Sequence, residues 1–556
     1  MSDASSVVIP MAVLDMQSPA TPTAVDPAAF KQIIDLGIAL SAERNHDRLL
    51  ESILLGAKDI ANADGGTIYL RTDEDRLAFA IIRNDTLGIA MGGTTGKTIP
   101  FPPLRMYREE DSQPNHSNVS THVALTGSTI NIADAYNAAN FDFSGTKAFD
   151  AKTGYRSKSF LTVPLKNHKG DVIGVVQLIN ARLPKSADVI PFDPELVPLI
   201  ESLASQAAVA LDNQQLIQAQ KNLFDSFMTM MARAVDAKSA YTGGHCQRVP
   251  VLTEMLAEAA CAEAEGPFAE FQLTEDEWYE LQTAGGLHDV GKVTTPVHIM
   301  DKATKLEQIV DRINDVKTRF ELLKRDAEID YLKKALANGA DRTEIEQQFR
   351  ARADQITKDY AFIAECNIGG EFMADEKIAR LQEIAKQPVE LDGTVQPLLN
   401  EDEVMNLSIR RGTLNDADRK IINDHIVLTI QMLESLPFPK QMRRVPEIAG
   451  GHHEKMDGTG YPKGLKKEQM SVPARMMGIA DIFEALTAAD RPYKKPKTLS
   501  ESIKIMSFMK KDQHIDPELF DLFLRSGIYK KYAERFLLPE QIDEVNIDQY
   551  LTKKPA

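Results

Sequence analysis

A long helical stretch in the middle of the chain constrains the fold most, because it separates two sequences of different character. The stretch begins at about Pro194, passes Gln220 and runs toward Ser239; it is rich in Gln and partly apolar. Before it, short apolar runs typical of β-strands alternate with turns, whereas the pattern after it is helical almost to the end of the chain. At 556 residues the chain is also too long for a single hydrophobic core. The sequence therefore predicts two domains of different class joined by a rigid helix.

The first part of the chain is predicted to be an α+β domain over residues 29–215, followed by a linker helix over residues 216–239. Residues 1–28 mix Ala, Ser, Thr, Pro and Asp without a period, which is typical of a mobile tail. A helical pattern then runs from Phe30 to about Ala63, and a hairpin turn is expected at residues 167–171. The strand-like runs are Gly66–Arg71, Arg76–Arg83, Thr129–Ile132, Phe160–Pro164 and Val172–Asn180.

The second domain, residues 240–556, is expected to be all-α, with a charged helical insertion over residues 302–410. Within the insertion, apolar residues recur at alternating spacings of three and four, which is a short heptad seam. This seam predicts a helical hairpin that projects from the domain, and Asp392-Gly393 marks a turn on the return path. The seam residues are Leu306, Ile309, Ile313, Val316, Phe320 and Leu323.

Charge and cysteine content exclude several classes of function. The net charge of −17 argues against a general surface for nucleic-acid polymers. The three cysteines, Cys246, Cys261 and Cys366, form no CxxC pair and fit a reducing compartment. No signal peptide and no membrane-length apolar run is visible, so we expect a cytoplasmic protein that does not insert into a membrane.

A glycine-rich segment at Gly92–Thr98 is similar to a phosphate-binding loop, but it lacks part of that motif. The motif requires a glycine where this chain has Met91, and no β-α-β pattern surrounds the segment. We therefore interpret it as a loop of the first domain and assign no cofactor-binding residues.

The catalytic hypothesis starts from histidines in the second domain that lie beside carboxylates or beside each other. His288 precedes Asp289, His425 follows Asp424, and His452 and His453 are adjacent. Neighbouring side chains on a helix diverge by about 100°, so such pairs suit two metal ions side by side better than one. Imidazole and carboxylate ligands without thiolates favour iron or manganese. Two such ions can clamp a phosphate for in-line attack, although any one of these histidines taken alone is more often a packed or surface residue than a ligand.

The stretch from Asn137 to Asn180 resembles a GAF domain of the cyclic-nucleotide phosphodiesterase and adenylyl cyclase type. The resemblance covers residues 30–215 and implies a sensor domain that binds a small ligand such as a cyclic nucleotide. Ala181 follows Asn180 where the cyclic-nucleotide signature has Lys, so a domain that only dimerises remains the alternative. The matching segments are Asn140-Phe141, Asp150, residues 153–159, residues 163–165 and residues 174–180.

The second domain resembles the HD-GYP subgroup of the HD phosphohydrolases. The matching segments are residues 243–249, 287–293, 451–462, 480–487, 491–494 and 514–517. The resemblance implies that Asp289 bridges two metal ions, and that Lys292 contacts substrate phosphate or assists proton transfer. It further implies phosphate contacts from Arg491 and Lys494, and a loop at Gly458–Pro462 that borders the site and contacts partner proteins. The implied metal ligands are His245, His288, Asp289, His425, His452, His453 and Asp481.

Together these features predict a phosphodiesterase that hydrolyses cyclic di-GMP to pGpG, GMP or both, under the control of the GAF domain. Residues 241–244 contain no acidic residue, which favours two metal ions over three. We expect a homodimer paired along the connector helix, and a GGDEF-type protein as partner. The alternatives are hydrolysis of cyclic GMP-AMP, a catalytically weak receptor or scaffold, and an HD phosphohydrolase for another nucleotide.

Overall fold

The computed structural model describes residues 27–184, 186–239, 244–337, 341–370, 372–489 and 496–552. The chain divides into two compact units, residues 1–223 and 224–556. The predicted tail over residues 1–28 lies outside the described residues, apart from its last two. None of the helices in the described part of the chain is long and apolar enough to cross a membrane.

The first unit is built on one antiparallel sheet with the strand order β3-β2-β1-β7-β6-β5. Short strand β4 pairs with β2, and β8 pairs with β7. The predicted turn at residues 167–171 joins β6 to β7, and the Asn167 side chain accepts hydrogen bonds from the backbone N–H groups of Lys169 and Asp171. The strands are β1 Ala63–Arg71, β2 Arg76–Asn84, β3 Ile89–Gly92, β4 Leu104–Arg105, β5 Ile130–Ile132, β6 Phe160–Lys166, β7 Val172–Arg182 and β8 Val189–Ile190.

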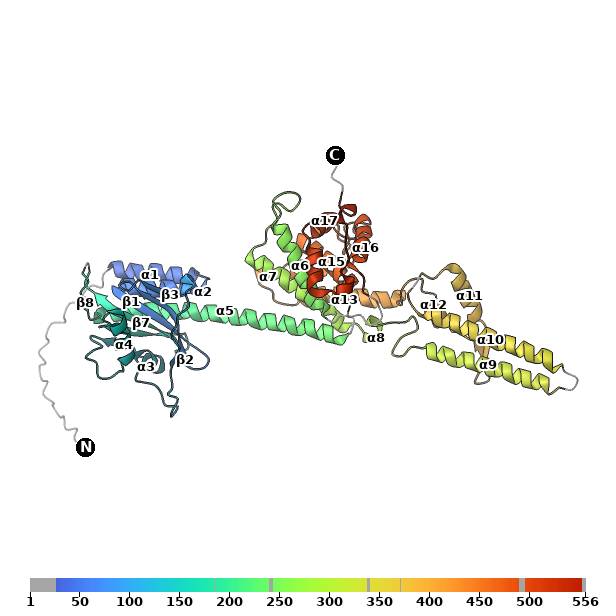
Figure 1. The fold of residues 1–556 in the computed structure, drawn as a ribbon, viewed down its shortest axis with the longest axis horizontal. Helices are drawn as coiled ribbons and strands as arrows, with labels where there is room; N and C mark the ends of the chain where they lie inside the picture. The colour runs from blue at the N-terminus through green and yellow to red at the C-terminus, as the bar shows by residue number, and fades with distance from the viewer. Residues whose placement is uncertain are drawn as a thin grey trace, which may run out of the picture. The chain divides into compact units, whose positions relative to one another are not determined.

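Helices cover both faces of this sheet (Figure 1). One face packs against α1 (Pro27–Ala42), α2 (His46–Ile60) and the first turns of α5 (Val197–Lys238), while the other packs against α3 (Val119–Thr126). The helical pattern from Phe30 to Ala63 is thus two helices rather than one. The break occurs because the Asn45 side chain accepts a hydrogen bond from Arg48 N and so begins a new helix.

The glycine-rich segment belongs to this unit, as predicted. Its first residue ends β3, and Gly93–Thr95 form a single 3-10 turn. The Arg83 guanidinium donates to the carbonyl oxygens of Met91 and Gly92 and pairs with Glu51. These bonds fasten the segment to its own sheet, and no β-α-β unit is present among the strands and helices described.

The predicted connector is confirmed as a continuous helix, α5, of 42 residues. It begins directly after a 3-10 turn at Pro194–Leu196. The N-cap of this turn is Asp193, whose side chain accepts a hydrogen bond from Glu195 N. Its last residues are packed in the second unit, where Phe224, Met228 and Met231 lie against the main core.

The second unit has a largely helical core, with α15 packed against α6 and α7 packed between α6 and α14. The helices outside the insertion are α6 His245–Cys261, α7 Glu275–Leu287, α8 Val297–Met300, α13 Asp416–Glu434, α14 Val445–Gly450, α15 Val472–Thr487, α16 Leu499–Lys511, α17 Pro517–Arg525 and α18 Ile528–Phe536. A 3-10 helix, η3 (Val290–Thr294), follows α7.

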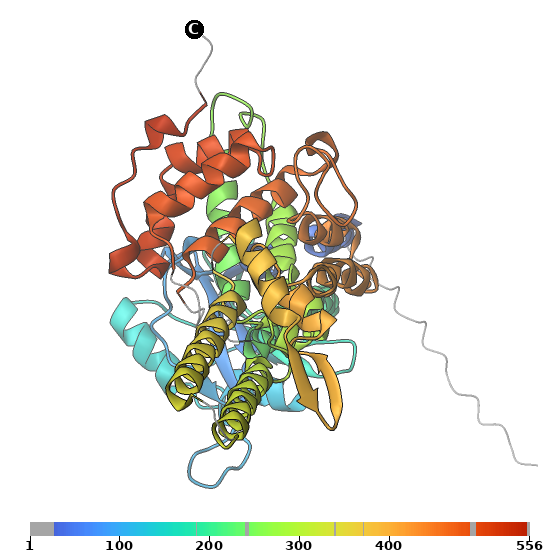
Figure 2. The same cartoon turned by 90° about the vertical axis from the view of Figure 1, so that its right-hand side faces the viewer.

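The insertion contains the predicted hairpin, an antiparallel pair of long helices lying side by side (Figures 1 and 2). It also holds two strands that the sequence reading did not anticipate, and the predicted turn at Asp392-Gly393 joins them. A hydrophobic core of its own unites the helices and β9, whereas the four residues of β10 are exposed. The elements of the insertion are α9 Ile313–Ala335, α10 Arg342–Asn367, α11 Asp375–Ala385, β9 Pro388–Leu391, β10 Thr394–Pro397 and α12 Glu401–Leu407.

The start of the heptad seam is corrected by the structure. Val316, Phe320 and Leu323 are buried on α9, as the seam requires, but Ile309 is 89% exposed and lies before the helix. Leu306 is buried, yet it sits in a bent segment whose turns include a bridge between Glu307 and Asp311. Polar bonds such as Leu306 N to Asn367 Oδ1 hold this segment, so the helix and its seam begin only at Ile313.

Candidate metal centre

The structure brings all seven predicted ligands into one buried cluster of the second unit. They come from helices and turns that are far apart in the sequence. The packing is close where η3 meets α13: a Cβ added at Gly291 would lie 2.0 Å from the carbonyl oxygen of His425. His245 opens α6, His288 and Asp289 join α7 to η3, His425 lies on α13, His452 and His453 follow α14, and Asp481 lies on α15.

Asp289 stands between two groups of imidazoles. Its Oδ2 lies 3.3 Å from His245 Nε2 and 3.3 Å from His288 Nε2. Its Oδ1 lies 3.3 Å from His425 Nε2 on the other side. The carboxylate is 1% exposed, so both oxygens point into the protein interior. One carboxylate therefore faces two separate sets of nitrogen atoms.

Each set has the composition of a metal site. The first contains His245, His288 and Asp289, and Asp481 Oδ1 adds an oxygen 3.2 Å from His245 Nε2. The second contains His425, His452 and His453, with the Nε2 atoms of His425 and His453 3.3 Å apart. Within each set of three, the potential ligand atoms lie within 4.8 Å of one another.

The distances and the unpaired atoms both fit bound metal ions. Two ligands about 2.1 Å from one ion, at angles near 90–110°, lie roughly 3.0–3.4 Å apart. The contacts of 3.2 to 3.3 Å around Asp289 and Asp481 fall in this range. Buried polar atoms normally have hydrogen-bond partners, yet Asp289 Oδ1 and His452 Nε2 have none among the described residues. An ion on each side of Asp289 would satisfy both atoms.

The far nitrogens of the imidazoles are fixed by backbone carbonyls. Nδ1 of His288 bonds the carbonyl of Gly285 at 2.8 Å, and Nδ1 of His452 bonds that of Ala449 at 2.7 Å. His425 makes the same kind of contact with Ile422. Because Nδ1 carries the proton in these bonds, Nε2 is left with a free lone pair that faces the cluster.

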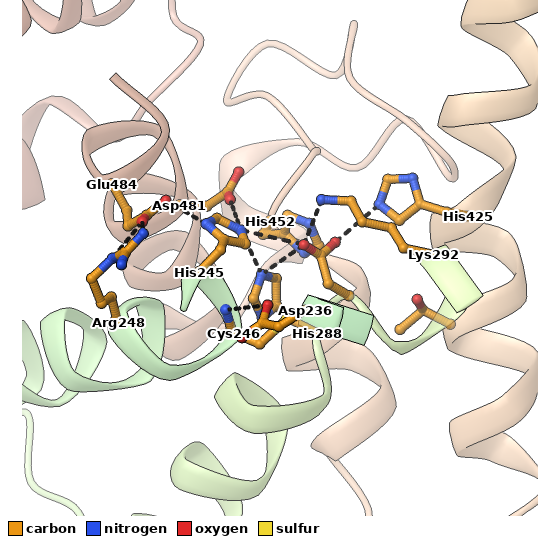
Figure 3. Close-up of polar contacts among 12 residues, drawn as sticks. Asp236, His245, Cys246, Arg248, His288, Lys292, His425, His452, Asp481 and Glu484 are labelled. Atoms are coloured by element: carbon orange, nitrogen blue, oxygen red, sulfur yellow. Dashed lines mark hydrogen bonds and ion pairs between the residues drawn. The ribbon is translucent and has the colours of Figure 1, made fainter. Parts of the chain in front are cut away.

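His245 is oriented by a side chain instead, which the sequence analysis missed. Its Nδ1 contacts Glu484, and the other oxygen of Glu484 takes a hydrogen bond from Arg248 Nε at 2.8 Å (Figure 3). Glu484 is fully buried, and it lies three residues after Asp481 on α15. That spacing places both acids on one helix face, a signal that was available in the sequence.

Burial and charge act in opposite directions on the histidines. Burial and the neighbouring His452 lower the pKa of His453 well below its usual value, and burial lowers that of His452 to about 4. Burial also disfavours charge on His245, but the hydrogen bonds that its ring donates to Asp289, Asp481 and Glu484 outweigh this effect and raise its pKa. The neutral forms of His452 and His453 are therefore favoured, which leaves their lone pairs available to a metal ion, whereas the protonated form of His245 is favoured.

Lys292 is the cation of the site. Its Nζ lies 2.5 Å from Asp289 Oδ2, and the side chain is 20% exposed. Burial alone would lower its pKa, but the charges of Asp289 and Asp481 raise it. A positively charged, partly exposed side chain thus lies beside the shared carboxylate of the cluster.

The predicted loop at Gly458–Pro462 borders the cluster. The ring of Tyr461 stacks on that of His453, with centroids 4.8 Å apart and planes 20° apart. Buried Glu454 accepts hydrogen bonds from the backbone N–H groups of Lys463 at 2.7 Å and Leu465 at 2.9 Å. The residue after the two histidines therefore ties the loop to the site.

Two of the predicted site residues and two further histidines of the second unit remain to be located. Arg491 and Lys494 lie outside the described residues. His298 and His514, which match no ligand position in the family pattern, belong to neither set of metal-type residues in the described chain.

Two domain families match the chain. Residues 45–211 match the GAF domain and residues 401–519 match the HD domain. The second match includes His425, His452, His453 and Asp481, whereas the segments with His245 and with His288-Asp289 precede it.

Relatives with described activities match parts of the chain. The 3'3'-cGAMP-specific phosphodiesterase 1 of Vibrio cholerae is 32% identical over 28% of this chain and 38% of its own length. A cyclic di-GMP phosphodiesterase of Pseudomonas aeruginosa is 36% identical over 23% of this chain and 29% of its own. A probable cyclic di-GMP phosphodiesterase of Vibrio cholerae is 45% identical over 25% of this chain and 34% of its own. The chain thus spans less than half the length of these relatives.

The six-strand path of the antiparallel sheet and the helical unit with its buried His and Asp residues agree with these two matches. The chain therefore carries an amino-terminal GAF domain and a carboxy-terminal HD domain, and parts of it are similar to phosphodiesterases of cyclic dinucleotides.

Proposed function

We propose that this protein is a metal-dependent phosphodiesterase of the HD-GYP type that hydrolyses cyclic di-GMP to pGpG, GMP or both. The observation that carries the proposal is Asp289, whose two oxygens face two sets of imidazole nitrogens at equal distances of 3.3 Å. That arrangement suits a pair of divalent ions, and relatives bearing the names of cyclic-dinucleotide phosphodiesterases supply the substrate class.

The proposed roles follow from the position of each group. His245, His288 and Asp481 would hold one ion, while His425, His452 and His453 would hold the other, with Asp289 shared. Bound there, two divalent ions, iron or manganese by ligand type, supply Lewis-acid activation of water and neutralise phosphate charge. Lys292 keeps its proton because of Asp289, so it contributes positive charge to a bound phosphate. Tyr461 covers His453 and limits access from that side.

The substrate is tested by comparing two cyclic dinucleotides. Full-length protein loaded with Mn²⁺ is incubated with cyclic di-GMP and with 3'3'-cyclic GMP-AMP, and kcat/KM is measured for each by chromatography. We expect the higher value for cyclic di-GMP. A higher value for cyclic GMP-AMP would assign that substrate, as in the first Vibrio cholerae relative. Binding of both without hydrolysis would instead support a receptor.

A homodimer that pairs along α5 is part of the proposal. Val209, Leu216, Leu223 and Met230 recur every seven residues on this helix and are between 42% and 72% exposed. Apolar residues at this interval form the seam of a coiled coil, so a second copy of the helix would bury them. A small ligand in the GAF domain and a GGDEF-type partner at the Gly458–Pro462 loop complete the proposed regulation.

A further inference from the structure

The last turns of α5 are built into the second unit rather than resting on its surface. Val235 is 1% exposed and forms a small apolar cluster with Ala232 and Cys246. Earlier in α5, Asp225 Oδ1 accepts a hydrogen bond at 2.8 Å from the hydroxyl of Tyr279 on α7. The end of the connector helix therefore packs beside the segment that begins α6.

Asp236 on this turn supplies the cap that α6 lacks. The residue at the N-cap position is Gly244, which has no side chain and a φ of 74°. The first N–H groups of a helix need acceptors from outside it. Asp236 Oδ2 accepts a hydrogen bond from Gly244 N at 3.1 Å. Its Oδ1 accepts one from Cys246 N at 3.5 Å (Figure 3). A carboxylate at this end also complements the helix dipole.

The capped residues flank a predicted metal ligand. His245 is the first residue of α6 and lies between Gly244 and Cys246, the two residues whose N–H groups Asp236 holds. The backbone position of His245 is therefore set by a side chain of α5, while Glu484 sets the rotation of its ring.

Lys238 makes the corresponding contact with the second ligand segment. Its Nζ lies 3.3 Å from the carbonyl oxygen of Lys292 and closer still to that of Val293. Both carbonyls belong to η3, which begins directly after Asp289. A lysine ammonium at the carbonyl end of a helix is favourably placed.

We infer that Asp236 and Lys238 are positioning residues that hold the His245 and Asp289 segments in register, so that the end of α5 sets the geometry of the metal centre. This inference rests on the proposed metal site. It makes the connector helix a part of that site: a displacement of its last turn would move two ligand segments at once.

The test measures metal affinity, which does not depend on any substrate. Full-length Asp236→Ala, Asp236→Asn and Lys238→Met proteins are titrated with Mn²⁺ under electron paramagnetic resonance, beside the wild type. Groups that support ligands from outside the coordination shell typically change metal affinity by about 10–100-fold. We expect a loss of that size for Asp236→Ala, a smaller loss for Asp236→Asn, which keeps one acceptor oxygen, and a several-fold loss for Lys238→Met.

Asp225→Asn is the matched control, since it weakens another α5 contact without touching either ligand segment. It should bind Mn²⁺ as the wild type does, even if its melting temperature falls. Wild-type affinity in both Asp236→Ala and Lys238→Met, or an equal loss in Asp225→Asn, would overturn the inference. If Asp236→Ala does not fold, the Asn and Met variants decide alone. A wild type that binds Mn²⁺ but hydrolyses no cyclic dinucleotide would contradict the proposed function and leave this test intact.

Discussion

At the scale of single residues, Asp289 is the group on which the proposal of two neighbouring metal sites, rather than one, depends. Asp289 offers Oδ2 to His245 and His288 of the first set and Oδ1 to His425 of the second. Loss of this carboxylate should therefore affect both ions, and loss of His453 should affect mainly the second.

The prediction is that Asp289→Ala retains less than one ion per chain, while His453→Ala retains about one and loses nearly all activity. Metal analysis of the purified proteins by inductively coupled plasma mass spectrometry measures this directly. His298→Ala is the control, because this exposed histidine lies outside both sets and should leave metal content unchanged. Two ions in Asp289→Ala would contradict the assignment of the bridge.

The sequence predicted the seven His and Asp residues that meet in the cluster, but not the residues that support them, and the predicted Arg491 and Lys494 lie outside the described residues. The paired histidines and acids were visible because ligand chemistry restricts residue type. Glu484 could have been found from its spacing to Asp481 on one helix face. Asp236 could not, since its partners are the backbone N–H groups of Gly244 and Cys246, and backbone contacts leave no signature in side-chain type.

At the scale of elements, the insertion has its own core and is joined by polar contacts to α13, which carries the candidate ligand His425. Lys302 Nζ lies 2.7 Å from Asp418 Oδ2 on α13, and the Thr413 hydroxyl donates to the Lys302 carbonyl. These residues lie at or beyond the two ends of the insertion's core elements. The helical hairpin could be predicted from the spacing of its apolar residues. Strands β9 and β10 could not, because a strand of four residues is too short to show an alternating pattern of apolar and polar residues.

Replacement of Thr304–Leu407 by a short Gly-rich linker should therefore preserve metal binding. The excised protein keeps Lys302, Thr413 and Asp418, so α13 retains its ion pair and its position. Two ions per chain by metal analysis is the expected result. As a control in the full chain, Phe320→Ala should destabilise the insertion by about 3–5 kcal/mol without loss of metal. A folded excision variant without metal would show that the insertion supports the site directly.

At the scale of the whole molecule, α5 runs from the sheet of the GAF domain to the residues that position the candidate metal ligands. It is one uninterrupted helix, as its sequence predicted, and its exposed apolar residues keep an interval of seven. A helix transmits rotation only while it stays rigid, and a ligand shifts the balance only by binding one state better.

Insertion of two residues near Gln218 would rotate the following face by about 200°, while insertion of seven would nearly restore its phase. We expect the two-residue variant to lose regulated phosphodiesterase activity and the seven-residue variant to stay near the wild type. Activity assays on both proteins, with their oligomeric state checked by light scattering, make the comparison. Equal activity in both would indicate that the GAF domain serves only for dimerisation.

The most direct test of the central claim is the fate of cyclic di-GMP in the presence of full-length protein, followed by chromatography with and without Mn²⁺. We expect metal-loaded protein to convert cyclic di-GMP to pGpG, GMP or both, and chelation to stop the reaction. Intact cyclic di-GMP after prolonged incubation with protein shown to carry two ions per chain, or equal turnover after complete chelation, would contradict the proposed function.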